Sequence, residues 1–329
     1  MTNSPILVLG SNSFSGASFC AHMLKQEQQV IAVSRSEEPS DALLPYRWQP
    51  NQPAFHQLDL NHHLGGIIEL IKKHNIKQVY NFAAQSMVGQ SWQYPEHWFM
   101  TNAVSTIKLH NELNKLDSLD RYIHISTPEV YGSCEGLVPE NKNYHPSTPY
   151  AVSRAAADMS LHTFADVYQF PVVFTRAANV YGEGQQLYRI IPRTILFALL
   201  GKVLPLHGGG HSTRSFIHID DVSSATQLIG DNGKLGEIYH ISTERMITIR
   251  ALVELIGDML HVPFEQVCEV TEDRLGKDAA YLLDTQKIRS ELSWQDQISL
   301  ENGLERTIAW VKNYKDILST LPHDYIHKA

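Results

Sequence analysis

The chain has 329 residues, 43% of them hydrophobic, with a formal net charge of −8 and a pI near 6.1. This length and composition can bury a large core, either as one large domain or as two coupled domains. We expect no nucleic-acid partner, because phosphate recognition needs clustered lysine and arginine and the sequence has no such run. The longest apolar run near the middle, residues 194–201, is far too short to cross a bilayer, so we expect no membrane partner.

The cysteine and histidine residues predict neither disulfides nor a metal site. Cys20, Cys134 and Cys268 form no CxxC pair and leave an odd thiol, which fits a reducing compartment. The 17 histidines include no HExxH arrangement, so we expect no metal. The chain begins almost directly with an apolar run and lacks the features of a secretory signal, so we predict a cytoplasmic protein.

Short apolar runs alternate with helical patterns through the first half of the chain. The runs are residues 6–10, 30–35, 78–84, 121–127 and, further on, 171–182. The helical intervals between and around them are residues 17–27, 63–74, 102–116 and 151–168. This alternation predicts an α/β fold, a Rossmann-type doubly wound parallel sheet with crossover helices on both faces.

The pattern changes after Gly182. Residues 189–202 predict a helix, and a loop with an edge strand follows before the chain returns to the sheet. From about residue 247 onward the sequence predicts a smaller α+β cap. We therefore predict a first domain of residues 1–178 plus about 215–242 and a second domain of residues 179–214 and 243–329. A ligand cleft is expected between them, at the carboxyl ends of the strands.

The turn between the first strand and the first helix is a candidate dinucleotide site. Gly10, Ser13, Phe14 and Gly16 lie where free N–H groups at a helix start can face a pyrophosphate. Ser13 stands where a dinucleotide fingerprint normally has its middle glycine, so we expect a Cβ where the backbone turns tightly. A plain strand-to-helix turn is the alternative interpretation.

Three further residues are candidates to bind the same dinucleotide. Asp59 and Leu60 are candidates to contact the edge of the adenine ring, although an aspartate there is as often a helix cap. Arg35 ends the second strand, and no aspartate or glutamate stands immediately at the strand tip to bind a ribose hydroxyl pair. Its guanidinium can hold a 2′-phosphate, which favours NADP over NAD, and a solvated arginine is the alternative.

Several motifs resemble the extended short-chain dehydrogenase/reductase family, and within it the nucleotide-sugar 4,6-dehydratases. Residues 126–132, STPEVYG, and 149–154, PYAVSR, carry the family pattern. Residues 83–96 are similar to GDP-mannose 4,6-dehydratases, whereas residues 214–222 and 273–284 look more like dTDP-glucose 4,6-dehydratases. The resemblance covers nearly the whole chain. It implies tightly bound NAD(P) in the first domain and a nucleotide-sugar substrate in the second.

The resemblance also implies a catalytic set. Tyr150 would remove the proton of the sugar C4 hydroxyl, Thr127 would orient that hydroxyl, and Glu129 would take the C5 proton once C4 is a ketone. In the dTDP-glucose group an aspartate precedes this glutamate and helps to expel the C6 hydroxyl. Here Pro128 occupies that place and has no proton to give. Either Glu129 serves as both base and acid, or water loss is not the reaction.

Arg154 stands one helical turn after Tyr150, where the family usually has a lysine. A cation on the same face lowers the pKa of the tyrosine, and either residue supplies that charge. Their shapes differ, because an ammonium group is compact and a guanidinium is broad and planar. We expect Arg154 to replace the lysine and to contact the cofactor, with loss of redox activity or a purely structural ion pair as alternatives.

The remaining site residues also come from the resemblance. Ala83 and Ser86, in the segment NFAAQS, would contact the cofactor and the substrate respectively. The substrate's nucleotide diphosphate would be held by Asn179, Arg189, Arg214 and Arg274. Members of the family pair the helices at residues 102–116 and 151–168 across a dimer axis, which implies a homodimer through a four-helix bundle.

Three alternative functions stay open at this point. A nucleotide-sugar 4-epimerase needs no base at C5, so Glu129 argues against it. A nucleotide-uronate decarboxylase shares the STxEVYG pattern. A catalytically silent NAD(P)-binding sensor or scaffold is suggested by Ser13, Pro128 and Arg154 together, whereas the presence of Thr127, Glu129 and Tyr150 argues against it.

Overall fold

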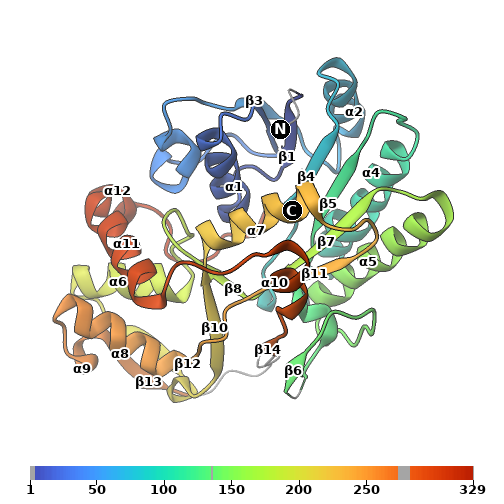
Figure 1. Ribbon diagram of the computed structural model, residues 1–329. Helices are drawn as coiled ribbons and strands as arrows, with labels where there is room; N and C mark the ends of the chain where they lie inside the picture. The colour runs from blue at the N-terminus through green and yellow to red at the C-terminus, as the bar shows by residue number, and fades with distance from the viewer. Residues whose placement is uncertain (1–3, 135, 273–281, 329) are drawn as a thin grey trace.

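The computed structural model describes residues 4–134, 136–272 and 282–328, and its main feature is a seven-stranded sheet (Figure 1). Its strand order is β3-β2-β1-β4-β5-β7-β11, and all neighbours are parallel. The strands are β1 (Ile6–Leu9), β2 (Val30–Ser34), β3 (Ala54–Gln57), β4 (Gln78–Asn81), β5 (Arg121–Ile125), β7 (Val172–Ala177) and β11 (Ile238–Ile241). The predicted Rossmann-type fold is confirmed.

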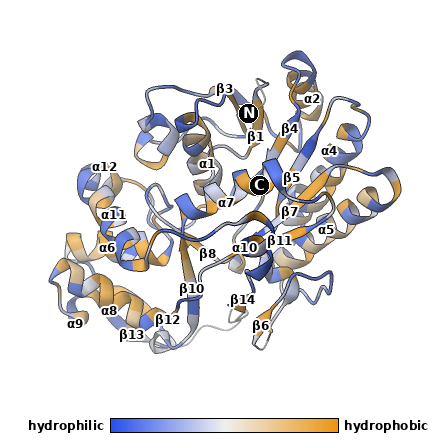
Figure 2. Ribbon diagram, viewed as in Figure 1, coloured by the Kyte–Doolittle hydropathy of each residue, from blue (hydrophilic) through white to orange (hydrophobic). Residues whose placement is uncertain are grey.

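Helices cover both faces of this sheet, which is why the inner strands are buried along most of their length and largely apolar (Figure 2). Successive residues of β1 point to opposite faces, so that Leu7 packs in one core cluster and Val8 in another. One face packs against α2 (Leu64–Lys73), α4 (Thr106–Leu113) and α5 (Pro149–Tyr168). The other face packs against α1 (Phe14–Lys25) and α7 (Ile219–Asn232), which also contact each other.

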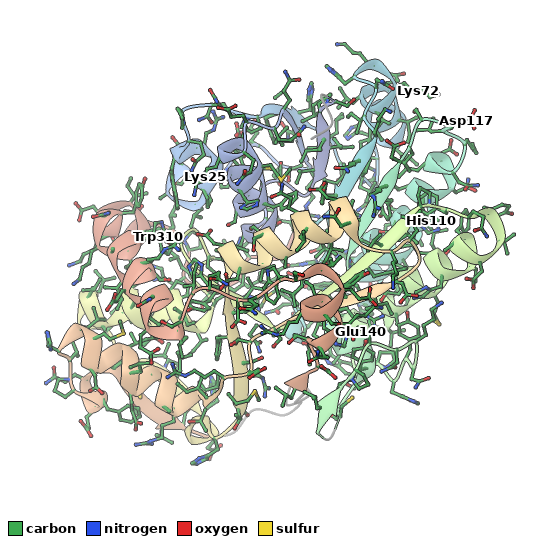
Figure 3. All side chains as sticks on the ribbon, viewed as in Figure 1. Lys25, Lys72, His110, Asp117, Glu140 and Trp310 are labelled. Atoms are coloured by element: carbon green, nitrogen blue, oxygen red, sulfur yellow. The ribbon has the colours of Figure 1, made fainter. Side chains whose placement is uncertain are left out.

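The second unit is built from helices and short strands beside the sheet. Its helices are α6 (Ile190–Leu200), α8 (Ile249–Leu260), α9 (Phe264–Val267), α11 (Leu300–Asn313) and α12 (Lys315–Thr320). Its strands are β8 (Asn179–Tyr181), β10 (Thr213–His218) and β12 (Met246–Thr248) in one sheet, and β9 (Leu204–His207) and β13 (Cys268–Thr271) in another. Trp310 of α11 donates a hydrogen bond of 2.9 Å to the carbonyl of Ala42, which ties this unit to the first (Figure 3).

The chain returns to the large sheet near its C-terminal end. Helix α10 (Gln286–Leu292) packs on β11 and α7, and β14 (Leu282–Leu283) pairs with β6 (Leu137–Val138). The two predicted domains are therefore interleaved in space, with α10 beside the first of them. Their boundaries stay a prediction.

The helix predicted at residues 102–116 differs from the structure. There α3 (Pro95–Trp98) leads into a π-helical stretch, Phe99–Ser105, before α4 begins. The π turn lets Asn102 reach two segments, accepting from the Gln85 main-chain N–H at 2.8 Å and donating to Ser153 of α5 at 3.0 Å. Hydrophobic spacing alone does not distinguish a π turn from an α turn.

In the part of the chain that the structure describes, no helix has the length and apolar character needed to span a membrane. A search of the same residues finds no group of three histidine, cysteine or acidic side chains placed to hold a metal ion.

Candidate active site

A cavity of about 340 Å³ opens at the carboxyl ends of β1, β2 and β4. This is the point where the strand order reverses direction, the usual ligand crevice of such sheets. Most of the predicted cofactor residues line it: Gly10, Ser13, Arg35, Asp59, Leu60 and Ala83. The predicted residues Phe14, Gly16, Tyr150 and Arg154 lie outside its lining.

The turn from β1 to α1 forms a close cradle at this cavity. Gly10 has a φ of +79°, and a Cβ there would lie 2.6 Å from the main-chain nitrogen of Ala83. A Cβ at Gly16 would lie 2.3 Å from the carbonyl oxygen of Gly10. Both glycines are therefore required by close backbone contact, and Ser13, the residue before the first turn of α1, lines the cavity, so the start of this helix borders the place where a pyrophosphate would bind.

Ser13 carries the expected Cβ without backbone strain. Ser13 has extended backbone angles, φ −73° and ψ 156°, which any residue adopts. It is the N-cap of α1, where its hydroxyl accepts from the N–H of Gly16 at 3.1 Å and donates to the carbonyl of Gly10 at 2.7 Å. Phe14, the next residue, is buried in the core under the turn.

Other cavity residues were missed by sequence reasoning. Asn12 donates from its amide to the carbonyls of Ser36 and Glu37, which fixes the tip of β2 against the turn. Gln85 and Lys328 also line the cavity, and Lys328 comes from the opposite end of the chain. Gln85 lies within the NFAAQS segment, between the predicted Ala83 and Ser86, but was not itself singled out, and no motif marks Lys328.

The predicted catalytic residues gather where β5 ends and α5 begins. Thr127 caps a 3₁₀ turn, Pro128–Tyr131, and its hydroxyl accepts from the N–H of Glu129 at 3.2 Å. Tyr150 lies in the first turn of α5, and the Thr127 hydroxyl lowers the pKa of its phenol. The charges of Glu129 and Arg189 also act on Tyr150.

Opposing effects act on the pKa of Tyr150. Burial raises it above its ordinary value, and the Glu129 carboxylate adds to the rise. The Arg154 cation is the largest opposing influence, ahead of Thr127 and Arg189, but the pKa stays raised. The Arg154 cation thus acts on the Tyr150 pKa in the direction predicted for it, and its part in the reaction stays a prediction.

Arg154 is buried, and its guanidinium is engaged at the end of β5. Its Nη2 donates to the main-chain carbonyl of Ile125 and lies 3.4 Å from Nε2 of His124. The same His124 nitrogen lies 3.2 Å from Asp158, which in turn bonds Ser126 at 2.6 Å and Arg176 at 2.8 Å. Burial opposes ionisation of Asp158, but His124 and Arg176 hold its pKa well below the ordinary value.

A second buried layer continues from Arg176. The guanidinium stacks on the rings of Tyr131 and Tyr144, with 4.5 and 5.3 Å to their centroids. The Tyr131 hydroxyl lies 2.7 Å from His240, whose main-chain N–H donates to Glu140 (Figure 3). Burial lowers the pKa of His240 to about 3, so this histidine is neutral at physiological pH.

The predicted substrate residues that the structure describes lie on several different segments and outside the lining of the cavity. Asn179 donates from its side chain to the carbonyl of Ser215, and Arg214 donates to the carbonyl of Thr213 in β10. Arg189 precedes α6 and lies over the ring of Tyr188, and Ser86 is exposed in the loop after β4. Arg274 falls outside the described residues.

A family model described as GDP-mannose 4,6 dehydratase matches residues 7–307. The chain belongs to this family. It is 31% identical to the dTDP-glucose 4,6-dehydratase of Haemophilus influenzae, over 93% of this chain and 97% of that protein. It is also 31% identical to the Escherichia coli dTDP-glucose 4,6-dehydratase, over 94% of each.

Solved structures agree. DesIV, a dTDP-glucose 4,6-dehydratase from Streptomyces venezuelae with NAD bound, superposes with a TM-score of 0.87 at 30% identity, over 95% of this chain and 98% of that one. A Thermotoga maritima UDP-glucose 4-epimerase superposes with a TM-score of 0.85 at 24% identity, covering 94% and 99%, which shows the shared fold alone. The predicted extended short-chain dehydrogenase/reductase family and the predicted enzyme class, a nucleotide-sugar 4,6-dehydratase, are confirmed.

Proposed function

We propose that this dehydratase converts an NDP-hexose to an NDP-4-keto-6-deoxyhexose at the cluster of Thr127, Glu129, Tyr150 and Arg154. The observation that carries the proposal is that Thr127 caps the 3₁₀ turn that carries Glu129, while Tyr150 lies in the first turn of α5, where both residues influence its pKa. One site thus offers a base for the C4 hydroxyl, a hydrogen bond to orient it, and a carboxylate for C5.

Tyr150 acts first, as a phenolate that takes the proton of the C4 hydroxyl. Gly10, Ser13 and Ala83 would hold NAD(P), which would supply the hydride chemistry between C4 and C6. Thr127 shares the hydroxyl and holds it in line with Tyr150. Arg154 stabilises the phenolate from the buried side, and because Asp158 is paired with Arg176, the charge of Arg154 stays available to Tyr150.

Glu129 acts in the second stage. The C4 ketone acidifies C5, whose proton moves to the Glu129 carboxylate. Since Pro128 has no proton to give, Glu129 passes this proton to the leaving C6 hydroxyl, which departs as water. A solvent-derived proton then returns to C5 as the hydride reaches C6.

We infer that Asn179, Arg189 and Arg214 bind the substrate's diphosphate and that Ser86 contacts its sugar. Arg189 is near enough to Tyr150 for its charge to lower the pKa of the phenol, which supports a place beside the reacting sugar. Guanidinium groups suit the task because they can contact phosphate oxygens bidentately. Arg274 belongs to the same proposal on its motif alone.

One assay tests the reaction against its alternatives. The purified protein is incubated with GDP-, dTDP-, UDP- and CDP-sugars in deuterated water, and the products are analysed by mass spectrometry. The dehydratase product lacks one water and carries deuterium at C5. An epimerase product shows neither change, and a decarboxylase product has lost carbon dioxide. Retention of NAD(P) with no turnover of any sugar would favour the silent sensor and contradict the proposal.

We also propose that the pocket binds NAD(P) and that Arg35 tilts the choice toward NADP. Arg35 lines the cavity at the tip of β2, whereas the neighbouring Glu37 carboxylate would favour a free ribose hydroxyl. A 2′-phosphate would gain a charge-assisted hydrogen bond from the guanidinium. The ratio of the NAD and NADP dissociation constants tests this. Arg35→Ala should move that ratio toward NAD by about tenfold, and an unchanged ratio would contradict the role.

Finally, we propose a homodimer formed by the π-helical stretch, α4 and α5. Large apolar side chains are exposed along these elements, among them Met100, Val104, Val152 and Met159. Light scattering after gel filtration should show a dimer for the native chain and a monomer for Met159→Glu. Ile317→Glu, at a similarly exposed position on α12, is the matched control and should stay dimeric.

A further inference from the structure

The last described residues, 321–328, form a segment that we call the tail, and it leaves α12 to cross toward the first unit (Figure 1). On the cap side, Asp324 lies 3.1 Å from Arg193 of α6. Tyr325 packs edge-on against Tyr188, with ring centroids 5.5 Å apart. The tail is therefore anchored on the second unit before it reaches the cavity.

His327 then docks on the first unit. Its ring stacks on Tyr94 and on Trp98, each at 5.0 Å between centroids and within 11° of parallel. Its Nε2 lies 2.8 Å from Nδ1 of His97, so one nitrogen donates and the other accepts. Three aromatic rings of the segment 94–98 thus hold one side chain of the tail.

Lys328 completes the crossing at the mouth of the cavity. Its main-chain carbonyl accepts from the side-chain amide of Gln85 at 2.7 Å and from the Arg35 guanidinium at 3.2 Å. Both donors line the cavity, as does Lys328 itself. The Gln85 backbone is held in place by Asn102, which also bonds Ser153 of the helix that carries Tyr150.

We propose that the tail is part of the cofactor site and retains the dinucleotide by bridging the two units across its pocket. The inference rests on the proposed NAD(P) binding and adds a segment that lies beyond the family match, which ends at residue 307. Arg35 and Gln85 therefore connect the tail directly to the lining of the pocket. A cofactor can leave only after the contacts of His327 and Lys328 have broken.

The test measures the rate at which bound NAD or NADP dissociates, by displacing it with excess of the other dinucleotide. Two variants loosen the tail: a chain that ends at Leu321, and His327→Ala in the full chain. Ile326→Ala is the matched control, because this neighbouring residue is exposed, with 62% of its surface accessible to solvent. We expect both loosened variants to release cofactor about tenfold faster or more, and the control to match the native chain.

The outcomes separate this inference from the proposed function. If the native chain holds cofactor and the two loosened variants release it equally slowly, the proposed role of the tail is overturned. The dehydratase proposal then stays intact. Tighter binding of the cofactor by the shortened chain would show that the tail competes with the cofactor, and would also overturn the proposed role of the tail. A native chain that binds neither NAD nor NADP would overturn both. Thermal unfolding of each variant without cofactor shows whether the fold is kept.

Discussion

The guanidinium of Arg154 donates a hydrogen bond to the main-chain carbonyl of Ile125, the last residue of β5. This contact fixes the cation beneath Tyr150 and ties it to the strand end that leads into Thr127 and Glu129. A lysine would have a compact ammonium in its place, so the substitution exchanges a small mobile donor for a larger, anchored one. The effect of the Arg154 charge and the effect of the guanidinium shape can therefore be tested separately.

We expect Arg154→Met to slow the oxidation at C4 and to move its pH dependence upward. The Arg154 cation lowers the pKa of Tyr150, so its removal raises that pKa and the phenolate forms only at higher pH. We expect the loss of this one charge to shift the pH profile by about one unit and to lower the rate at pH 7 about tenfold. The measurement is single-turnover reduction of the nicotinamide, followed by absorbance across pH.

Arg154→Lys is the control for shape. It restores the charge and should bring the pH profile back to that of the native enzyme, with a rate within about tenfold. A methionine variant that keeps the native profile would show that Arg154 is only a structural residue at the β5 end.

Glu129→Gln should separate the two stages of the reaction. Oxidation at C4 needs Tyr150 and not Glu129, so the variant should still reduce its cofactor in the presence of substrate. Elimination needs the carboxylate, and its rate should fall by about 10² to 10⁴, the usual contribution of a general base. Absorbance of the reduced cofactor and mass spectrometry of the product give the two readouts. Dehydration at the native rate would remove Glu129 from this role.

Asp158→Asn should destabilise the protein by about 3–5 kcal/mol, because it leaves the buried Arg176 without its anion. The folded pKa of Asp158 is lowered, so its contribution to stability is present above the ordinary carboxyl value and is lost as the pH falls through the folded pKa. The difference in unfolding free energy between native and variant should therefore be largest above about pH 4 and narrow below it. Urea unfolding across pH measures this.

Asp120→Asn is the control for that variant. Asp120 is exposed and pairs with Lys77 at 3.7 Å, so its loss should change the unfolding free energy by less than about 0.5 kcal/mol. Equal effects of the two variants at pH 7 would contradict the importance of the buried pair.

The sequence predicted the parallel sheet, the β1 to α1 turn and the catalytic helix, because each is encoded in residues that are close together in the chain. It did not predict where the Arg154 guanidinium lies. That depends on His124 and Asp158, which lie on different elements and share no local pattern with it. The tail was also missed, since His327 meets His97 from 230 residues away and no motif marks either residue.

Ser13 shows a different limit. The missing fingerprint glycine predicted a Cβ where the backbone turns tightly, but backbone angles are not visible in a motif. The structure gives Ser13 ordinary extended angles and a capping role, while the positions that tolerate no side chain are Gly10 and Gly16. The turn thus keeps the features of a pyrophosphate site although Ser13 replaces the usual glycine of the motif.

Gly16→Ala tests this cradle directly. Its Cβ would lie 2.3 Å from the carbonyl of Gly10, so α1 must move away from β1. We expect a loss of about 1–3 kcal/mol in unfolding free energy from the overpacking, together with weaker NAD(P) binding because the helix start is displaced. Gly65→Ala in α2 is the matched control, since its Cβ meets nothing within 4 Å and should stabilise the helix by up to about 1 kcal/mol. Calorimetric titration measures cofactor binding, and chemical unfolding measures stability. A Gly16→Ala protein that binds cofactor as tightly as the native chain would show that the cradle does not hold the pyrophosphate.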